Sequence, residues 1–417
     1  MALSKQYSLK RLDFELLTDA EINCKSAGAR ISGVRAVFWS HGDLWLEATA
    51  YLANKAFEQE SLGKSLDTIN GHASSLTVYG TFLEQFGLDW SRFPKDRSKR
   101  PTYLFRGHLI QEINNCNIAR TTAARHITVI RAFYHWVREC ALIDRASEPY
   151  RTNQTSIRFT DDFGLTRVKQ IQTSDLAIRT PRSHIRGVEN GLYPIKLQER
   201  NQLLRVAEKN FSPEFVLALK LGFFTGMRIQ SILGLTQTVL RKHLPSRELE
   251  GWFSIEIGGH SGVPAKQGAH YFPSIPSWLL NELLDYCKRP RHAIRQKKAK
   301  QVNQDLVFIG QRGQRLNSRS YSQHMTKLRA LLQAQGLMLN NFHFHCTRAT
   351  FGTALVLMLL DAAFPTKNIL QKLMATMGHT SAESSLSYIK FIENEKEMAD
   401  MAAAYSSYLG LSDENNE

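Results

Sequence analysis

A helical repeat of apolar residues runs through much of this 417-residue chain and limits the folds open to it. The repeat is clearest in TTAARHITVIRAFYHWVREC, where Ile127, Ile130, Tyr134 and Val137 are spaced as on one face of a helix. Similar patterns occupy residues 44–143 and return in the second half of the chain. The periodicity therefore predicts a mainly α-helical fold.

One segment alternates as a strand does. In GWFSIEIGG, Phe253, Ile255 and Ile257 alternate with Ser254 and Glu256, which is the spacing of a half-buried strand. A region rich in glycine and proline follows, and then AHYFPSIP. We therefore expect one small antiparallel sheet among the helices.

Changes in pattern along the chain predict its division into parts, and the length suits two domains. The predicted parts are an N-terminal extension over residues 1–43, a helical domain over 44–147, a basic connection rich in Thr, Ser and Arg over 148–187, a second domain over 188–410 and an acidic tail over 411–417.

The charge of the chain points to an anionic partner. Lysine and arginine number 53 against 38 aspartates and glutamates, giving a formal net charge of +15. Phosphate-rich polymers are the first partner to consider, and an anionic membrane surface is the competing one. No apolar run is long enough to span a bilayer, and the longest, Ala354–Leu360, is predicted to be a buried helix. The five scattered cysteines without a CxxC pair, and an N-terminus without a signal peptide, favour a reducing, cytoplasmic setting.

Two segments of the second half carry cations at positions suited to an anion. In FFTGMRIQSILGL, Gly226 interrupts one helical pattern, so Arg228 is predicted in the first turn of the next helix, where phosphate is favoured. An ordinary surface arginine is the alternative. In GVPAKQGAHYF, Lys266 lies in the turn region between strands, where a solvated lysine is common.

Two further segments carry histidines. In FHFHCTRATFGT, His345 and Arg348 are three residues apart and share a helix face, whereas His343 is five residues from Arg348 and does not. The predicted pair is His345 with Arg348, with a buried structural histidine as the alternative. In LMATMGHTSAESSLSYIKF, His379 follows a glycine and Tyr388 lies nine residues later. Alone, Tyr388 would be read as a core tyrosine.

In their order Arg, Lys, His-x-x-Arg, Gly-His, Tyr, these residues resemble the tyrosine recombinase (phage integrase) family, over about residues 190–405. Residues 44–143 resemble the helical core-binding (SAM-like) domain of the same family more loosely. The resemblance implies a mainly α fold, with that domain joined to a mostly helical catalytic domain that contains a small antiparallel sheet.

The resemblance also implies a reaction. Tyr388 would be the nucleophile that attacks a DNA phosphodiester and forms a 3′-phosphotyrosine link, without metal or ATP, and the chain shows no P-loop motif. Arg228 and Arg348 would bind the non-bridging oxygens of the phosphate.

The remaining roles concern hydrogen bonds and protons. His379 would donate a further hydrogen bond to the phosphate, and His345 would assist proton transfer near the nucleophile. Lys266 would protonate the leaving 5′-oxygen as general acid. Lys242 and the basic run over residues 288–300 are alternatives for that lysine.

The chain departs from the family pattern at supporting positions. Ser231 stands where the family usually has an acidic residue three positions after the first arginine. Cys346 and Thr347 replace an Asp-Leu pair, and Ala349 replaces a histidine. Because all six chemical positions are filled, an active enzyme is expected.

Two basic regions are predicted to contact DNA backbone phosphates, with a solvated charge run as the alternative. The predicted contacts are Arg120, Arg125, Arg131, Lys288, Arg289, Arg291, Arg295, Lys297 and Lys298. After Tyr388, a stripe of Met398, Met401, Ala402, Tyr405 and Leu409 predicts an amphipathic helix that packs either on its own domain or on a neighbouring protomer.

The expected function is that of an integrase of a mobile element, acting on double-stranded recombination sites as a homotetramer, with an accessory DNA-bending or directionality factor as a further partner and no membrane. Three alternatives stay open at this point. They are a chromosome-dimer resolvase, an enzyme like a type IB topoisomerase, and a DNA-binding relative of the same fold that has lost the reaction.

Overall fold

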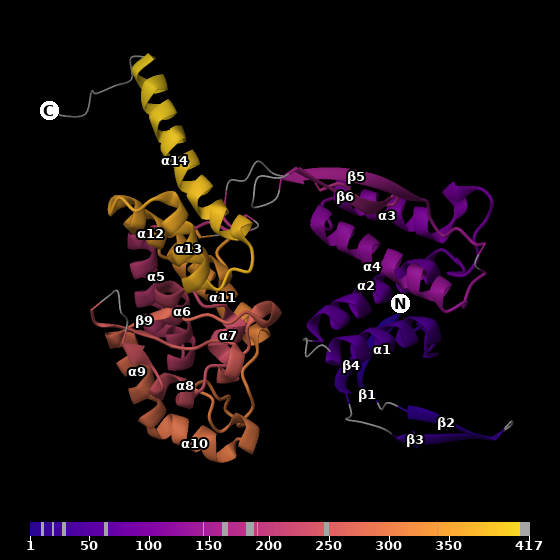
Figure 1. The fold of residues 1–417 in the computed structure, drawn as a ribbon, viewed down its shortest axis with the longest axis horizontal. Coiled ribbons are helices and arrows are strands. Elements are labelled where there is room, and N and C mark those ends of the chain that lie inside the picture. Colours follow the sequence, from indigo (N-terminus) through magenta and orange to yellow (C-terminus); the bar gives the residue numbers. More distant parts are fainter. Residues whose placement is uncertain are drawn as a thin grey trace. The chain divides into compact units, whose positions relative to one another are not determined.

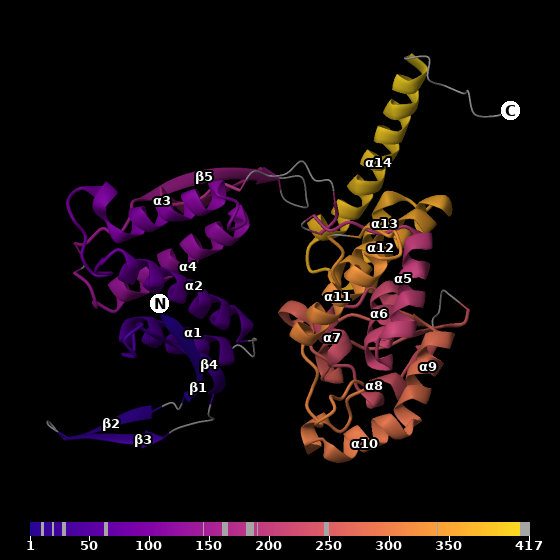
Figure 2. The same cartoon turned by 180° about the vertical axis from the view of Figure 1, so that it is seen from behind.

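The protein is described by a computed structural model in two compact units, Met1–Pro181 and Arg182–Glu417. The structure describes residues 1–9, 12–18, 21–26, 31–61, 66–144, 146–160, 166–180, 187–189, 191–245, 250–339 and 341–408. Both units are mainly helical and carry short antiparallel strands (Figures 1 and 2). The predicted fold class is confirmed, whereas the predicted five-part division stays a prediction, and its tail at 411–417 lies outside the described residues.

The first unit is built on a helical core. Its helices are α1 (Leu46–Ser61), α2 (Asp67–Gln85), α3 (Pro101–Asn114) and α4 (Arg120–Glu139), with the 3₁₀ turn η1 (Arg97–Lys99) before α3. All four residues of the stripe predicted from the sequence are buried on α4, so the helical spacing identified its core face correctly. The Tyr134 hydroxyl lies 2.8 Å from that of Tyr79 and donates to the Trp90 carbonyl at 2.7 Å, which satisfies it inside the core.

The described part of the first 43 residues contains β-strands. Strand β1 (Leu3–Leu9) pairs antiparallel with β4 (Ile31–Phe38), and β2 (Leu12–Thr18) pairs with β3 (Glu21–Ser26). Val34 and Val37 of β4 are buried in the same core as Trp45. The buried residues of β4 do not alternate regularly, and the β1–β4 register shifts between Tyr7 and Ser8, so no strand pattern is visible in the sequence.

The predicted basic connection also contains strands. β5 (Thr152–Thr160) and β6 (Thr166–Ser174) form an antiparallel hairpin. After it, Leu176 and Ile178 are buried in the core of the first unit. The abundance of threonine that made the segment look irregular is also typical of strands.

The second unit surrounds the buried helix α6. Its helices are α5 (Leu197–Asn210), α6 (Pro213–Thr225), α7 (Ile229–Leu233), α8 (Gln237–Arg241), α9 (Ser277–Lys288), α10 (Pro290–Lys298), α11 (Ser318–Gln333), α12 (His345–Asp361), α13 (Thr366–Met377) and α14 (Ala382–Tyr408). The 3₁₀ turns are η2 (Gly259–Ser261), η3 (Lys266–Gly268) and η4 (Gln301–Asn303). Helices α5 and α12 pack against α6. Both the α12 and the α14 segments contribute to the same hydrophobic core.

The sheet predicted around GWFSIEIGG is present. It has three antiparallel strands in the order β7 (Leu244–Pro245), β8 (Trp252–Ser254) and β9 (Ser274–Pro276). Beyond β8, Ile255 and Ile257 are buried as predicted, and Ile257 bridges to Tyr271. The regular strand is therefore shorter than the alternation suggested.

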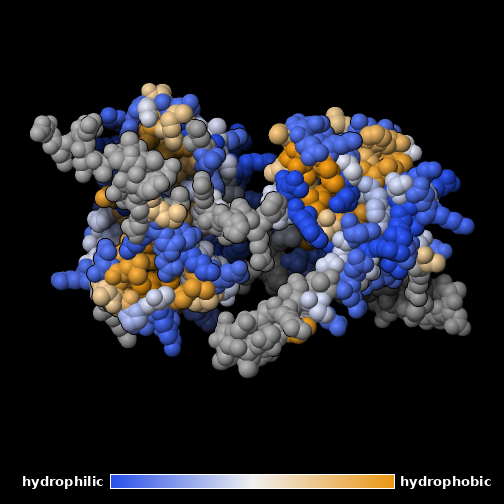
Figure 3. Space-filling view, turned by 90° about the horizontal axis from the view of Figure 1, so that it is seen from above, coloured by the Kyte–Doolittle hydropathy of each residue, from blue (hydrophilic) through white to orange (hydrophobic). Residues whose placement is uncertain are grey.

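The apolar run Ala354–Leu360 in α12 is only partly buried. Val356 and Leu359 face the core, whereas Leu357 is 39% exposed and Met358 is 49% exposed. The prediction of a buried helix therefore holds for one side of α12, and the other side lies at the surface. In the view of Figure 3, hydrophobic residues also lie between hydrophilic ones on the surface of each unit. Among the helices described, none combines the length and the hydropathy that crossing a bilayer requires.

A buried carboxylate ties α6 to the basic helix α10. Glu214 is 3% exposed and accepts from Arg291 Nε at 2.8 Å and from the Tyr286 hydroxyl at 2.9 Å. Arg295 Nη1 lies 2.8 Å from the same carboxylate and also donates to the Ile309 carbonyl. Arg295, predicted to contact DNA, is instead buried in this network. Burial raises the pKa of Glu214, but hydrogen bonds from Arg291, Ser212 and Tyr286 outweigh it and bring the pKa down to about 2.

Glu214→Gln should therefore destabilise the second unit. Removing one partner of a buried ion pair costs about 3 to 5 kcal/mol, measurable as a lower free energy of unfolding in urea. Because folding lowers the pKa of Glu214, its contribution is present above the unfolded pKa of about 4.3 and is lost as pH falls from there toward about 2. The variant should lose that acid sensitivity. Glu208→Gln, which removes an exposed partner of Lys220, is the control and should cost at most about 1 kcal/mol. An equal loss in both variants would contradict the prediction.

Candidate active site

The first arginine of the predicted set stands where one helix ends and another begins. Gly226 ends α6 in the left-handed conformation, with φ of 66°, and Arg228 is the residue just before α7. A Cβ on Gly226 would lie 2.4 Å from the Phe351 ring, so only glycine fits this turn. Arg228 is half-buried and its Nη1 reaches the Gly378 carbonyl at 3.5 Å. It therefore precedes the helix, rather than lying in its first turn as predicted.

The second arginine lies in the first turn of α12, which begins at His345. Arg348 is fully buried, and its Nη1 and Nη2 donate to the carbonyls of Gly226 and Met377 at 2.6 and 2.9 Å. His345 lies on the same side of the helix, whereas the exposed His343 turns to the Asn341 carbonyl. His345 and Arg348 both contact the Glu189 carboxylate, and their predicted roles stay a prediction.

The carboxylate of Glu189 contacts four of the predicted site residues. Glu189 Oε1 accepts from Arg348 Nε at 3.2 Å, from His379 Nε2 at 2.5 Å and from the Tyr388 hydroxyl at 3.1 Å. Its Oε2 lies 3.3 Å from His345 Nε2. Side chains from α12, α14 and the turn after α13 thus meet at a single anionic group.

His379 is held from both sides. Its Nδ1 lies 2.7 Å from the hydroxyl of Ser385, which is fully buried on α14. Because a carboxylate only accepts, Nε2 carries the hydrogen toward Glu189, and Nδ1 then accepts from Ser385 when the ring is neutral. The imidazole also stacks on the Tyr388 ring, with centroids 6.0 Å apart. The ring is therefore fixed in both position and tautomer.

Burial and charge set the protonation of the cluster. Burial would raise the pKa of the Glu189 carboxyl, but hydrogen bonds from His345 and His379 and the charge of Arg348 lower it far below its usual range. Burial lowers the pKa of His379. Burial, and next the charge of Glu189, raise the pKa of Tyr388 well above its ordinary value. In this arrangement Glu189 is ionised and Tyr388 keeps its proton.

The structure therefore brings five of the six predicted residues together. Arg228 interacts electrostatically with Arg348, Glu189 and Tyr388. The sixth, Lys266, is exposed on η3, and the hydrogen bonds described around Glu189 include none from it.

The departures from the family pattern have local explanations. Ser231 is buried and its hydroxyl donates to the Pro264 carbonyl at 2.7 Å, two residues before the segment that carries Lys266. Thr347 donates to the Phe344 carbonyl at 2.8 Å, and Ala349 is fully buried in the core. These side chains support loop and helix positions and do not touch Glu189 in the described contacts.

The sequence did not predict two residues of the site, Glu189 and Ser385. Glu189 is the acidic residue of RGVENGLYP, a stretch whose glycines indicate a turn and nothing more. Ser385 lies in a serine-rich run and is six residues from His379 and three from Tyr388. On a helix, that second spacing puts Ser385 near the face of Tyr388, which is the one signal available.

The residues predicted to contact DNA differ in exposure. Arg120, Arg125, Lys288, Arg289, Arg291, Lys297 and Lys298 are exposed, and Arg131 is half-buried over the Tyr150 ring at 5.8 Å. Of the exposed residues, Arg291 is held by Glu214. Met398, Met401, Ala402 and Tyr405 of the stripe predicted after Tyr388 lie on α14, whereas Leu409 lies outside the described residues. Of these side chains, that of Met401 is described, and it is exposed.

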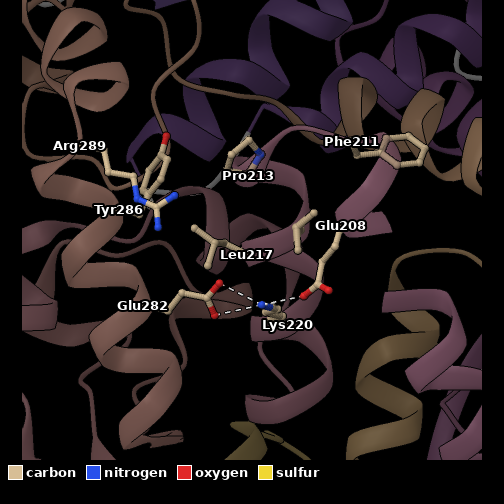
Figure 4. Close-up of a pocket in the computed structure, with 9 residues that line it drawn as sticks. Glu208, Phe211, Pro213, Leu217, Lys220, Glu282, Tyr286 and Arg289 are labelled. Carbon is tan, nitrogen blue, oxygen red and sulfur yellow. Dashed lines mark hydrogen bonds and ion pairs between the residues drawn. The ribbon is translucent and has the colours of Figure 1, made fainter. Parts of the chain in front are cut away.

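A separate pocket between α5, α6 and α9 offers a contrast (Figure 4). Its lysine, Lys220, is held between Glu282 at 2.9 Å and Glu208 at 3.0 Å. The cation there is matched by two carboxylates. At the Glu189 cluster the basic groups outnumber the carboxylates, because one carboxylate faces two guanidinium groups and two imidazoles.

The chain is similar to known proteins in both sequence and structure. Residues 277–394 match the Phage integrase family. The chain is similar to the Tn1549 transposon integrase in complex with circular intermediate DNA, with a TM-score of 0.50 and 14% identity over 84% of this chain and 99% of that one. A complex of the same integrase with transposon right end DNA gives the same TM-score and identity, and covers 98% of that chain. A lambda integrase dimer bound to a COC′ core site has 15% identity and a TM-score of 0.44. No curated protein matches the chain.

The family match and the site coincide. The matched residues run from the start of α9 into α14 and contain His345, Arg348, His379 and Tyr388. The structural likeness independently gives the fold of the Tn1549 integrase. Residues 277–394 are thus a region of the phage integrase family, and they carry four of the six residues that the sequence predicted for the reaction.

Proposed function

We propose that this protein is a tyrosine recombinase that cleaves and rejoins double-stranded DNA at specific sites through a 3′-phosphotyrosine intermediate at Tyr388, and that it integrates or excises a mobile element. The observation that carries the proposal is the convergence of Arg228, His345, Arg348, His379 and Tyr388 on one anionic group. A site that holds a carboxylate with these donors is chemically suited to a phosphodiester.

In the proposed reaction the Tyr388 oxygen attacks the phosphorus, and the bond from phosphorus to the 5′-oxygen breaks. Arg228 and Arg348 donate to the non-bridging oxygens and stabilise the charge that builds on them. His379 donates from Nε2, the nitrogen that now faces Glu189. His345 receives or relays the tyrosine proton.

Lys266 is proposed to protonate the leaving 5′-oxygen. It is exposed on η3, between β8 and β9, so it has to approach the phosphate when DNA is bound. A hollow of about 1130 Å³ runs beside this sheet and is lined by His270, Phe272 and His379. Its position supports an approach of DNA past the sheet to the site.

The partners follow from charge and from the relatives. The net charge of +15 favours duplex DNA, and the exposed cations of α4 and α10 suit its backbone. The Tn1549 integrase was solved in complex with circular intermediate DNA and with transposon right end DNA. We extend that to this chain by proposing paired recombination sites, a homotetramer on DNA and an accessory factor that bends DNA or sets direction.

The test is covalent trapping. Inverted half-sites are sought in the DNA that flanks the gene, and duplexes nicked near the predicted cleavage point are incubated with the full chain. We expect a protein–DNA adduct that resists denaturation. Trypsin cleaves after Lys372 and Lys390, so the adduct should map to peptide 373–390, which contains Tyr388 as its single tyrosine. An adduct on another peptide, or tight DNA binding without any adduct, would contradict the proposal.

A further inference from the structure

We propose that Glu189 is an internal substitute for the scissile phosphate, which closes the active site until DNA displaces it. This inference rests on the proposed function, since it assumes that the surrounding donors bind phosphate. The occupant it must give way to is a phosphodiester of the DNA backbone.

The contacts of Glu189 are those that the reaction assigns to phosphate. Arg348 Nε at 3.2 Å, His379 Nε2 at 2.5 Å and His345 Nε2 at 3.3 Å all face its two oxygens. A carboxylate and a phosphodiester each carry one negative charge and offer two acceptor oxygens. Exchange of one for the other therefore conserves both the charge and the hydrogen bonds of the site.

The nucleophile is closed off by the same group. The Tyr388 hydroxyl donates to Glu189 Oε1 at 3.1 Å, and both Tyr388 and Arg348 are fully buried. A DNA phosphate cannot reach these donors while the carboxylate occupies the space between them. Substrate binding and the Glu189 contacts thus exclude each other.

The cations of the site have no other carboxylate among the contacts described. Arg348 uses its remaining donors on the carbonyls of Gly226 and Met377, and Arg228 reaches the Gly378 carbonyl. If Glu189 leaves, two guanidinium groups remain partly or wholly buried without a counterion. Such a site gains from taking up an anion.

The backbone that delivers Glu189 is strained. Glu189 has a φ of 36°, in the left-handed region that residues with a side chain rarely adopt. It sits in a tight turn closed by hydrogen bonds between Val188 and Leu192 at 2.8 and 2.7 Å. The turn comes soon after Pro181, the last residue of the first unit. The strain is sustained by the contacts of the carboxylate, so the turn can relax once phosphate replaces them.

A permanent support for His345 is the rival role for Glu189. Ser231 occupies the position where the family usually has an acidic residue, and Glu189 could supply that charge from another segment. The two roles make opposite demands. A substitute for phosphate must leave before the reaction, whereas a support must stay during it.

The experiment compares the full wild-type chain with Glu189→Gln, which removes the charge at nearly constant size, and with Glu189→Ala, which removes the group. Sodium tungstate serves as an oxyanion probe that needs no recombination site. Its affinity is measured by calorimetry, and thermal unfolding is followed with and without it. We expect both variants to bind tungstate at least about 10-fold more tightly than wild type, because the competing group is gone. They should unfold at lower temperature alone and recover more with tungstate.

The covalent assay gives the second readout. At low DNA concentration, Glu189→Gln should form the Tyr388 adduct faster than wild type. Glu208→Gln, which removes one negative charge from the α5 pocket of Figure 4, is the matched control. It should change neither the affinity for tungstate nor the rate of adduct formation.

The outcomes separate the two proposals. Unchanged or weaker tungstate binding in both Glu189 variants overturns the substitute role, whatever the adduct assay gives. Tighter tungstate binding with slower adduct formation also overturns it, since Glu189 then supports the reaction. Tighter binding in a chain that never forms an adduct supports an occupied anion site and contradicts the proposed recombinase reaction alone.

Discussion

Tyr388→Phe should form no covalent adduct with nicked recombination-site DNA, under conditions in which the wild-type chain converts a measurable fraction of it. The change removes one oxygen, which is the atom proposed to attack phosphorus. The ring is fully buried, stacks on His379 and packs on Gly352, where a Cβ would lie 2.4 Å from it. Phenylalanine keeps all of that packing, so the loss is chemical and not structural.

Two measurements test whether Tyr388→Phe leaves the fold and DNA binding intact. Thermal unfolding should place Tyr388→Phe close to wild type, and gel-shift titration should give nearly unchanged DNA binding. Tyr405, which lies further along the same C-terminal segment, offers a matched variant in Tyr405→Phe, which should keep full adduct formation. An adduct of normal yield in Tyr388→Phe would exclude Tyr388 as the nucleophile.

Arg348→Lys should lower the rate of adduct formation by at least about 100-fold, the usual cost of losing one donor to developing charge. Lysine keeps the positive charge but not the planar fork of three nitrogens. In this chain that fork donates to Glu189, Gly226 and Met377 at once. A single ammonium group on a flexible stem cannot replace all three bonds. The rate is measured by single-turnover quench on the nicked substrate.

The same substitution will destabilise the fold, because two buried carbonyls lose a donor. Arg295→Lys is the matched control, since Arg295 is also buried, donates to the Ile309 carbonyl and pairs with Glu214 away from the site. It should destabilise the chain to a similar extent and leave the adduct rate per folded molecule unchanged. Equal rate losses in the two variants would mean that Arg348 acts only through stability.

The sequence predicted those features that depend on local spacing. The core face of α4 and the shared face of His345 and Arg348 follow from the helical repeat alone. The left-handed turn at Gly226 follows from the chemistry of glycine. Each of these needs only neighbours within a few residues.

Features set by distant contacts could not be predicted in the same way. Glu189 gains its role from residues more than 150 positions away in the chain, and its own segment indicates only a turn. In the basic run of α10, nothing distinguishes the buried Arg295 from the exposed Lys297 and Lys298. The buried residues of strand β4 do not alternate regularly, and its register with β1 shifts, so the sequence shows no strand pattern there. In each case the partner, and not the residue itself, decides the outcome.

The helix α14 begins three residues after His379 and carries Tyr388 at the end of its second turn. Past Tyr388 it continues to Tyr408 and extends beyond the helices on which its base packs (Figure 1). That remainder is a rod of roughly 30 Å, at 1.5 Å per residue. Because a helix is stiff along its axis, a displacement of the C-terminal end of α14 would also move the Tyr388 side chain. Tyr388 and the far end of α14 therefore belong to one continuous helix, and the position of the attacking oxygen depends on how that helix is held.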